Sequence, residues 1–312
     1  MERFKNRLIK WLFRLVRWLA YRRTLPAYKF RRAMEFFTSL LGTPDFATYE
    51  PFGLSFMEAE WITPDNWDHE KYILYLHGGG YGMGSINSHR SLMARLGRAA
   101  RARVLGINYR LAPEHPFPAA VEDASTAYRY LLDLGIPPCH IAVAGDSAGG
   151  GLTVALLVKL RDEGQPLPAA GVCFSPWMDL SPAWDKRRYK ESCDPFIDLK
   201  SIEIWGRKYA GVHVGHPLAS PIHADLRGLP PLLVQVGTCE VLHYDALSLR
   251  DHCVRDGVPC VLEEYPDQIH VFQVFGGFLK TSDKALISAG MFIKKQLACL
   301  EKEKKSCSNE SY

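Results

Sequence analysis

The chain has 312 residues, of which 47% are hydrophobic, 23% charged and 12% aromatic, an ordinary composition for a soluble globular protein. This length suits one α/β domain with an insertion as well as two separate domains. Eight cysteines without a C-x-x-C pair argue against a disulfide framework and a zinc site, and the formal net charge of +4 is small.

The positive charge is concentrated at the N-terminus, where residues 1–32 carry eleven Lys or Arg against the single acid Glu2. The opening MERFKNRLIKWLFRLVRWLAYRR predicts an amphipathic helix with separate apolar and basic stripes. The apolar stripe is Phe4, Leu8, Trp11, Leu15 and Trp18, and the basic stripe is Arg7, Lys10, Arg14 and Arg17. Charges interrupt every apolar run, so we expect neither a membrane span nor a signal peptide. The helix either packs its Trp/Leu face on the core, the alternative we favour, or lies on anionic lipid.

Strand-like runs then alternate with helical patterns along the chain. The strands are expected at 71–76, 103–108, 140–145, 170–175, 232–237 and 260–265, and the helices near 88–101, 119–134, 148–163 and 242–256. Continuous apolar strands joined by helices predict an α/β fold with a mostly parallel central sheet covered on both faces. Residues 176–215, rich in Trp, Pro and charge, break the alternation. We interpret them as an insertion that could form a lid together with the N-terminal helix.

The run HIAVAGDSAGGG at 140–151 places a serine where a strand hands over to a helix. An α/β sheet presents its chemistry at the carboxyl ends of its strands. A nucleophile there must project above the sheet, which forces the backbone through a tight turn. Gly145 and Gly149 avoid collisions at that turn, and Asp146 completes the motif before the serine. The pattern predicts that Ser147 occupies a nucleophile elbow.

A second glycine-rich segment, HGGGYGMG at 77–84, directly follows the 71–76 strand. Backbone N–H groups held around the oxygen of a tetrahedral intermediate stabilise its charge, and glycine lets the main chain come close. A phosphate loop is disfavoured because the G-x-x-x-x-G-K-S/T pattern is missing. The N–H groups of Gly79, Gly80 and Ala148 are the candidate oxyanion hole, with His77 and Gly78 as structural support.

Four motifs occur together: HGGG, YRLAPEHPFPAA at 109–120, GDSAGG, and SPIHADLRGLPPLLVQVG ending at Gly237. From roughly residue 45 to 295 the chain resembles the hormone-sensitive-lipase-like family of α/β-hydrolase carboxylesterases. The resemblance implies an α/β-hydrolase fold, a Ser-His-acid triad, and a helical cap made from the N-terminus and an insertion after the sixth strand. It also implies that Gly79, Gly80 and Ala148 donate to the oxyanion. The expected organisation is N-terminal cap helices at 1–48, a catalytic core at 49–177 and 216–302, a cap insertion at 178–215, and a loose polar tail at 303–312.

The remaining two triad members follow from chain order, because α/β-hydrolases place serine, acid and histidine in that sequence. His270 lies in the loop after the 260–265 strand, where it can reach back over Ser147. Glu240 lies three residues beyond Gly237, whereas Asp245 falls about a turn into the next helix, which carries it off the sheet edge. We therefore favour Glu240 as the acid, although many family members have Asp in this context.

The expected function is a serine carboxylesterase that hydrolyses small apolar esters of short to medium acyl chain through an acyl-enzyme on Ser147. A lactone or amide hydrolase stays open because the carbonyl chemistry is shared, and a non-catalytic small-molecule receptor is disfavoured because all triad types are present. Five tryptophans suggest an apolar pocket, although tryptophan more often only packs in a core: Trp11, Trp18, Trp177, Trp184 and Trp205.

We expect no cofactor, no nucleic-acid partner and no metal, since His213, His216 and His223 have no nearby Cys or carboxylate partner on a helical face. The missing signal peptide and membrane span predict a cytoplasmic location. Contact of the basic N-terminal helix with a membrane, and a homodimer, are left open.

Overall fold

The computed structural model describes residues 2–21, 31–32, 35, 38, 42–181 and 194–309. Its centre is an eight-stranded sheet in the order β1-β2-β4-β3-β5-β6-β7-β8. The strands are β1 (Ala47–Leu54), β2 (Met57–Pro64), β3 (Tyr72–Leu76), β4 (Arg103–Ile107), β5 (Ile141–Asp146), β6 (Ala170–Phe174), β7 (Leu232–Gly237) and β8 (Cys260–Tyr265). From β4 to β8 neighbouring strands are parallel, and β1 and β2 form an antiparallel edge. The expected fold class is confirmed, and each predicted strand agrees within one residue.

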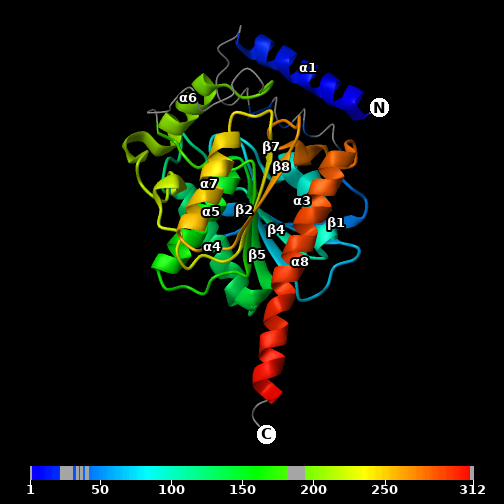
Figure 1. The fold of residues 1–312 in the computed structure, drawn as a ribbon, viewed down its shortest axis with the longest axis vertical. Coiled ribbons are helices and arrows are strands. Elements are labelled where there is room, and N and C mark those ends of the chain that lie inside the picture. The colour runs from blue at the N-terminus through cyan, green and yellow to red at the C-terminus, as the bar shows by residue number, and fades with distance from the viewer. Residues whose placement is uncertain are drawn as a thin grey trace.

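Helices cover both faces of the sheet (Figure 1). They are α1 (Glu2–Tyr21), α3 (Ile86–Ala100), α4 (Ala119–Asp133), α5 (Ala148–Asp162), α6 (Leu199–Ala210), α7 (His243–Arg255) and α8 (Lys280–Asn309). One buried cluster joins α3 and α8 to one face of the sheet, and two others join α4, α5 and α7 to the opposite face. The four predicted core helices agree within two residues at each end.

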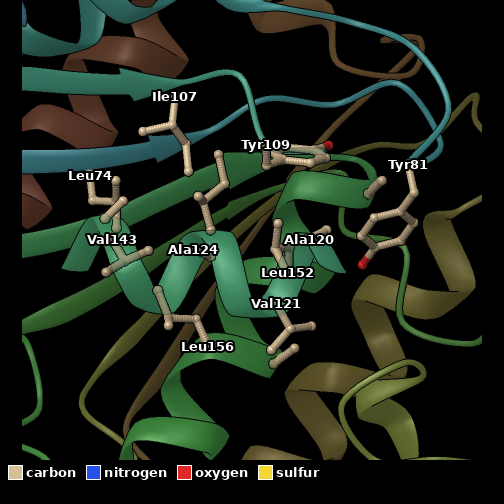
Figure 2. Close-up of a cluster of buried hydrophobic side chains, with 14 of the residues drawn as sticks. Leu74, Tyr81, Ile107, Tyr109, Ala120, Val121, Ala124, Val143, Leu152 and Leu156 are labelled. Carbon is tan, nitrogen blue, oxygen red and sulfur yellow. The ribbon is translucent and has the colours of Figure 1, made fainter. Parts of the chain in front are cut away.

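The alternation of side chains along β3 shows how the two layers are built. Leu74 and Leu76 belong to the cluster under α4 and α5, while Ile73 and Tyr75 belong to the cluster under α3 and α8. Figure 2 shows the first cluster, in which Leu74, Ile107 and Val143 of the sheet meet apolar side chains of α4 and α5. Both faces of the parallel strands are buried, which explains their nearly continuous apolar sequence.

No residue range was expected from the sequence for β1, β2, α6 or α8. The β1–β2 hairpin at the sheet edge has many half-buried or exposed positions in β1, so its sequence lacks a continuous apolar run. Residues 303–309, at the start of the expected polar tail, continue α8. A helix already stabilised by buried residues such as Ile293 and Leu297 can add further polar turns at little cost, because propagation is easier than nucleation.

Helix α1 lies across the end of the molecule at which the parallel strands terminate (Figure 1). Its inward side chains are Glu2, Lys5 and Asn6, which bond to the α8 start and nearby loops, and Ile9, which is buried. The expectation that the Trp/Leu face packs on the core is wrong for Phe4, Leu8 and Trp11, which are exposed. Hydrogen bonds of Glu2, Lys5 and Asn6, together with the burial of Ile9, hold the opposite face inward. The side chains of Leu15 and Trp18 lie outside the description.

Helix α6 lies at the same end of the molecule as α1 (Figure 1). It belongs to the expected cap insertion at 178–215, of which 182–193, including Trp184, lie outside the described residues. Within the part of the chain that the structure describes, none of the helices combines the length and apolar character required to span a bilayer.

Candidate active site

Ser147 occupies the single position between the end of β5 and the start of α5. Its φ of 53° and ψ of −119° lie in a region that residues with a side chain rarely adopt. The flanking glycines are required by close approach: a Cβ on Gly145 would collide with the carbonyl of Gly149, and one on Gly149 with the carbonyl of Leu76. The local geometry is therefore the sharp strand-to-helix turn expected from the sequence.

His270 and Glu240 form a buried hydrogen-bonded pair. His270 follows β8 and Glu240 follows β7, and 2.6 Å separates His270 Nδ1 from Glu240 Oε2. The Glu240 Oε1 atom accepts hydrogen bonds from the Gly237 amide and, at 2.9 Å, from the Ser175 hydroxyl. Burial lowers the pKa of His270, but the hydrogen bond and negative charge of Glu240 outweigh it, so the net pKa is raised above its usual value.

Ser175 connects this pair to the strand beside Ser147. Its hydroxyl donates to Glu240 and also accepts a hydrogen bond from the Val271 amide at 3.1 Å. In the β5–β6 register Asp146 is opposite Phe174, so Ser147 and Ser175 directly follow paired residues. The Ser147 amide donates to the Phe174 carbonyl at 2.8 Å. The structure thus brings Ser147, Glu240 and His270 to one edge of the sheet.

Asp245, the alternative acid, has a different set of contacts. It lies in the first turn of α7, and its Oδ2 accepts hydrogen bonds from the amides of Met178 at 2.8 Å and Asp179 at 3.2 Å. Its carboxylate therefore fixes the chain after β6. Of the two candidate acids, Glu240 contacts His270, whereas Asp245 contacts the chain after β6.

The HGGG loop follows β3 and passes beside the elbow. The Gly78 amide donates to Asp146 Oδ1 at 3.0 Å, and a Cβ on Gly78 would collide with that carboxylate. Gly79 and Gly80 have φ values of 121° and 61°, which favour glycine. Ala148 is the first residue of α5, so its N–H has no intrahelical acceptor. These conformations suit amides presented to a ligand.

A buried ion pair lies behind the HGGG loop. Asp146 Oδ2 pairs with His89 Nε2 at 3.2 Å, and Asp146 Oδ1 accepts a hydrogen bond from the Tyr75 hydroxyl at 2.7 Å. Burial opposes both charges, yet their mutual attraction and hydrogen bonding raise the pKa of His89 and lower that of Asp146. His77 differs: burial lowers its pKa to about 3, so its ring is neutral, stacked on Tyr109 with Nδ1 against the Gly78 carbonyl. Asp146 and His77 were expected from the sequence as supports of the site, whereas Tyr75, His89 and Ser175 were not expected there.

Aromatic side chains surround the HGGG loop on the side of the insertion. Trp205 of α6 and Trp177 both pack next to Gly80, and a Cβ on Gly82 would collide with the Trp205 ring. Tyr81 stacks on Tyr209 of α6, with ring centroids 3.7 Å apart. Of the five tryptophans considered from the sequence, Trp177 and Trp205 lie beside the candidate site and Trp11 is exposed to solvent.

Other candidate binding features lie away from this edge. Among the described residues, no group of three or more His, Cys, Asp or Glu is arranged to hold a metal ion. His213 and His216 instead pack against the Phe117 ring. A surface hollow of about 370 Å³ near β1, β2 and α3 is lined by residues including Glu60 and Arg90, and none of the triad candidates lines it.

The fold and this edge define an α/β-hydrolase, and comparison with known proteins agrees. The family model described as alpha/beta hydrolase fold matches residues 73–274. An acetyl-hydrolase of Streptomyces hygroscopicus is 48% identical over 237 residues, which cover 76% of this chain and 79% of the relative.

Two solved structures show the same similarity. An esterase from the bacterial hormone-sensitive lipase family has a TM-score of 0.84 and 43% identity, covering 88% of this chain and 92% of that chain. The esterase EstE5, soaked with p-nitrophenyl butyrate, also has a TM-score of 0.84 and 43% identity, covering 88% of this chain and 92% of that chain. The chain therefore belongs to the α/β-hydrolase family, among its hormone-sensitive-lipase-like esterases, as the motifs indicated.

Proposed function

We propose that this esterase is a serine carboxylesterase for small apolar esters of short to medium acyl chain, acting through an acyl-enzyme on Ser147. The observation that carries the proposal is the 2.6 Å contact between His270 Nδ1 and Glu240 Oε2. This contact leaves Nε2 of the same ring as the nitrogen that can act as a base. Both residues lie at the sheet edge where the strained elbow presents Ser147.

In the proposed mechanism, His270 Nε2 removes the proton from Ser147 Oγ as that oxygen attacks the ester carbonyl. The amides of Gly79, Gly80 and Ala148 stabilise the oxyanion, and loss of one such donor typically costs about 3–4 kcal/mol of transition-state stabilisation. The protonated His270 then gives its proton to the leaving alcohol. Water, deprotonated by the same ring, attacks the acyl-enzyme and releases the carboxylic acid. Glu240 stabilises the imidazolium in both steps.

The preference for small acyl groups is supported by the aromatic side chains at the HGGG loop. Trp177 and Trp205 pack close to Gly80, which restricts the space beside the proposed oxyanion donors. The relatives are consistent with this size, since one is called an acetyl-hydrolase and EstE5 was soaked with a butyrate ester.

The test is Ser147→Ala with p-nitrophenyl esters from acetate to palmitate. We expect kcat to fall by roughly 10⁶-fold and fluorophosphonate labelling to vanish, because the nucleophile is removed. Ser125→Ala is the matched control, since Ser125 is also a buried serine. This variant should keep both the esterase activity and the fluorophosphonate labelling. Labelling that persists in Ser147→Ala would overturn the nucleophile, and a maximum rate with palmitate would overturn the acyl preference.

A further inference from the structure

We propose that α1 docks the protein on the surface of an anionic lipid bilayer. The docking surface consists of an apolar stripe, Phe4, Leu8, Trp11 and Leu12, and of three neighbouring cations, Arg7, Lys10 and Arg14. This inference concerns an interaction surface and does not depend on the proposed catalytic residues.

The first argument is the orientation of α1. Glu2 Oε1 accepts hydrogen bonds from the amide and hydroxyl of Thr281, Asn6 Nδ2 donates to the Asp267 carbonyl at 3.1 Å, and Ile9 packs in a cluster with Ile269. Positions 2, 6 and 9 share one face at 3.6 residues per turn, so the helix is held at that face.

The apolar stripe therefore points outward. The side chains of Phe4, Leu8, Trp11 and Leu12 are 71%, 42%, 58% and 46% exposed. Phe278 extends this surface beyond the helix: it is 46% exposed, and the Lys5 ammonium lies 4.2 Å from its ring centroid. Four large apolar residues exposed on three turns of one helix are more than the scattered surface residues of an ordinary protein, and they indicate a surface that meets an apolar phase.

The second argument is charge. Helix α1 carries six cations and one acid, and that acid, Glu2, is bonded to Thr281 on the inward face. Arg7 and Arg14 are exposed and Lys10 is half-buried, on the face next to the apolar stripe. A second copy docked through the same stripe would bring two sets of cations together, whereas a bilayer with anionic headgroups complements them. Charge complementarity therefore selects lipid as the occupant.

Helix α1 lies next to the loop that carries His270, so docking would place the candidate active site near the bilayer. Asn6 donates a hydrogen bond to Asp267, and Ile9 shares a buried cluster with Ile269; these two residues lie three and one positions before His270. A helix lying in the headgroup layer would hold this loop next to the lipid surface. The chain would bind on the bilayer without crossing it.

The test measures sedimentation of the full chain with vesicles of phosphatidylcholine, alone or mixed with phosphatidylglycerol. We expect binding to the mixed vesicles, weak binding to phosphatidylcholine, and release at high salt as the Debye length shrinks from about 10 Å at 0.1 M to about 3 Å at 1 M. Phe4→Ser with Trp11→Ser should lower partitioning at least about tenfold, because two large side chains lose lipid contact. Replacing Arg7, Lys10 and Arg14 with glutamine should lower partitioning onto the vesicles about fivefold for each cation removed. Trp11→Phe alone should retain binding.

Two matched controls remove the same chemistry elsewhere. Val254→Ser with Met291→Ser removes exposed apolar side chains outside α1, and a triple Gln variant removes two exposed cations, Arg129 and Lys295, and the half-buried Arg250. Both should bind vesicles as the unaltered chain does, and the α1 variants should hydrolyse p-nitrophenyl butyrate in solution at an unchanged rate. Failure to bind the mixed vesicles, or equal binding by the α1 variants, would overturn the proposal. A dimer seen by light scattering would also overturn the proposal if Phe4→Ser with Trp11→Ser converted it to a monomer. In that case a second copy of the chain would cover the apolar stripe.

Discussion

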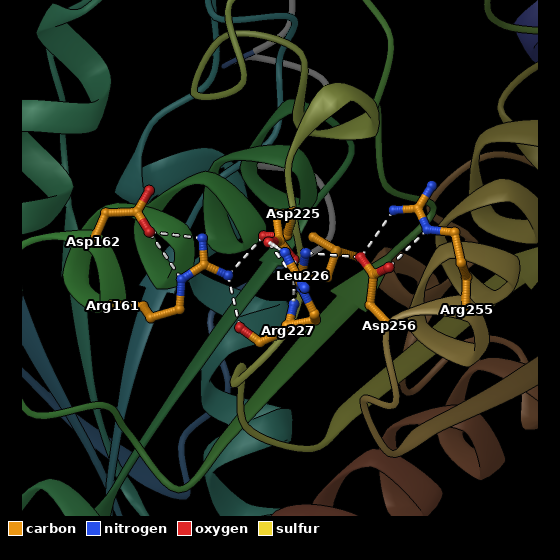
Figure 3. A network of polar contacts seen from close by, with 7 residues as sticks. All are labelled: Arg161, Asp162, Asp225, Leu226, Arg227, Arg255 and Asp256. Atoms are coloured by element: carbon orange, nitrogen blue, oxygen red, sulfur yellow. Dashed lines mark hydrogen bonds and ion pairs between the residues drawn. The ribbon is translucent and has the colours of Figure 1, made fainter.

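The two ends of the sheet use the same kinds of charged groups in opposite ways. At the carboxyl end, Glu240 and His270 are buried, and so are Asp146 and His89. At the amino end, where α5 and α7 finish, a chain of pairs runs through Arg161, Asp162, Asp225, Arg227, Asp256 and Arg255 (Figure 3). Distances at the two ends are similar: 2.6 Å for Glu240 with His270 and 2.7 Å for Asp256 with Arg255.

The difference lies in solvent. Arg227 lowers the pKa of Asp225 to about 2, but both groups are exposed, so water and salt screen the interaction and it contributes little to folding. The buried pairs have no such screening, and removing one member leaves an uncompensated polar group. A short distance therefore shows only that two groups are in contact, and the burial of the groups decides whether the contact contributes to stability or chemistry.

The largest expected effect at the buried end is that of Glu240→Gln. The amide cannot supply the negative charge that stabilises protonated His270, so kcat should fall by about 10⁴-fold with little change in KM. Because Glu240 raises the pKa of His270, activity of the unaltered enzyme should be lost as pH falls through a value above about 6.5, where the base becomes protonated. In Glu240→Gln this acidic limb should move to lower pH. Both quantities come from kcat–pH profiles with p-nitrophenyl acetate.

Asp245→Asn is the matched control for that prediction, because Asp245 is also a buried acid near the start of α7. It should leave the acidic limb in place and cost far less in kcat. A larger kcat loss for Asp245→Asn than for Glu240→Gln would assign the triad acid to Asp245.

An intermediate effect is expected for Ser175→Ala, which removes a positioning hydroxyl without touching substrate. The variant loses one hydrogen bond to the Glu240 carboxylate and leaves the Val271 amide without its acceptor. A hydrogen bond to a charged group contributes about 1.5–3 kcal/mol, so kcat should fall roughly 10- to 100-fold at unchanged KM. A kcat equal to that of the Ser125→Ala control would show that Ser175 does not position the pair.

The smallest effect is expected at the exposed end. Asp225→Asn removes the ion pair with Arg227, yet the hydrogen bonds from Arg161 to the backbone carbonyls of residues 225 and 227 remain available. Neither kcat nor the melting temperature should change measurably at neutral pH in moderate salt. A clear drop in melting temperature, followed by calorimetry, would mean that exposed pairs here act as a cooperative network.

The parallel strands could be predicted because they depend on local patterns. Apolar runs marked six strands, and Glu240 was chosen as the candidate acid from its position just past β7. Ser175 and His89 could not be found this way, since their partners Glu240 and Asp146 lie 65 and 57 residues away in the chain. Such contacts arise only when strand order brings separate loops together.

The orientation of α1 shows a different limit. Amphipathic periodicity predicted the helix, but not which face is inward. Glu2 and Asn6 orient the helix through hydrogen bonds to Thr281 and Asp267, which lie 279 and 261 residues away in the chain. A prediction from apolar periodicity assumes that the apolar face packs on the core. That assumption fails where polar contacts hold the opposite face of a helix inward.

The proposed nucleophile, Ser147, stores backbone strain at a single position. A residue with a Cβ at φ 53° and ψ −119° costs of order 1–3 kcal/mol relative to a relaxed conformation, and the surrounding sheet and helix must supply that energy. Glycine would adopt these angles without that penalty but has no hydroxyl. Replacement of Ser147 by glycine would therefore relieve the backbone strain and remove the hydroxyl in one step.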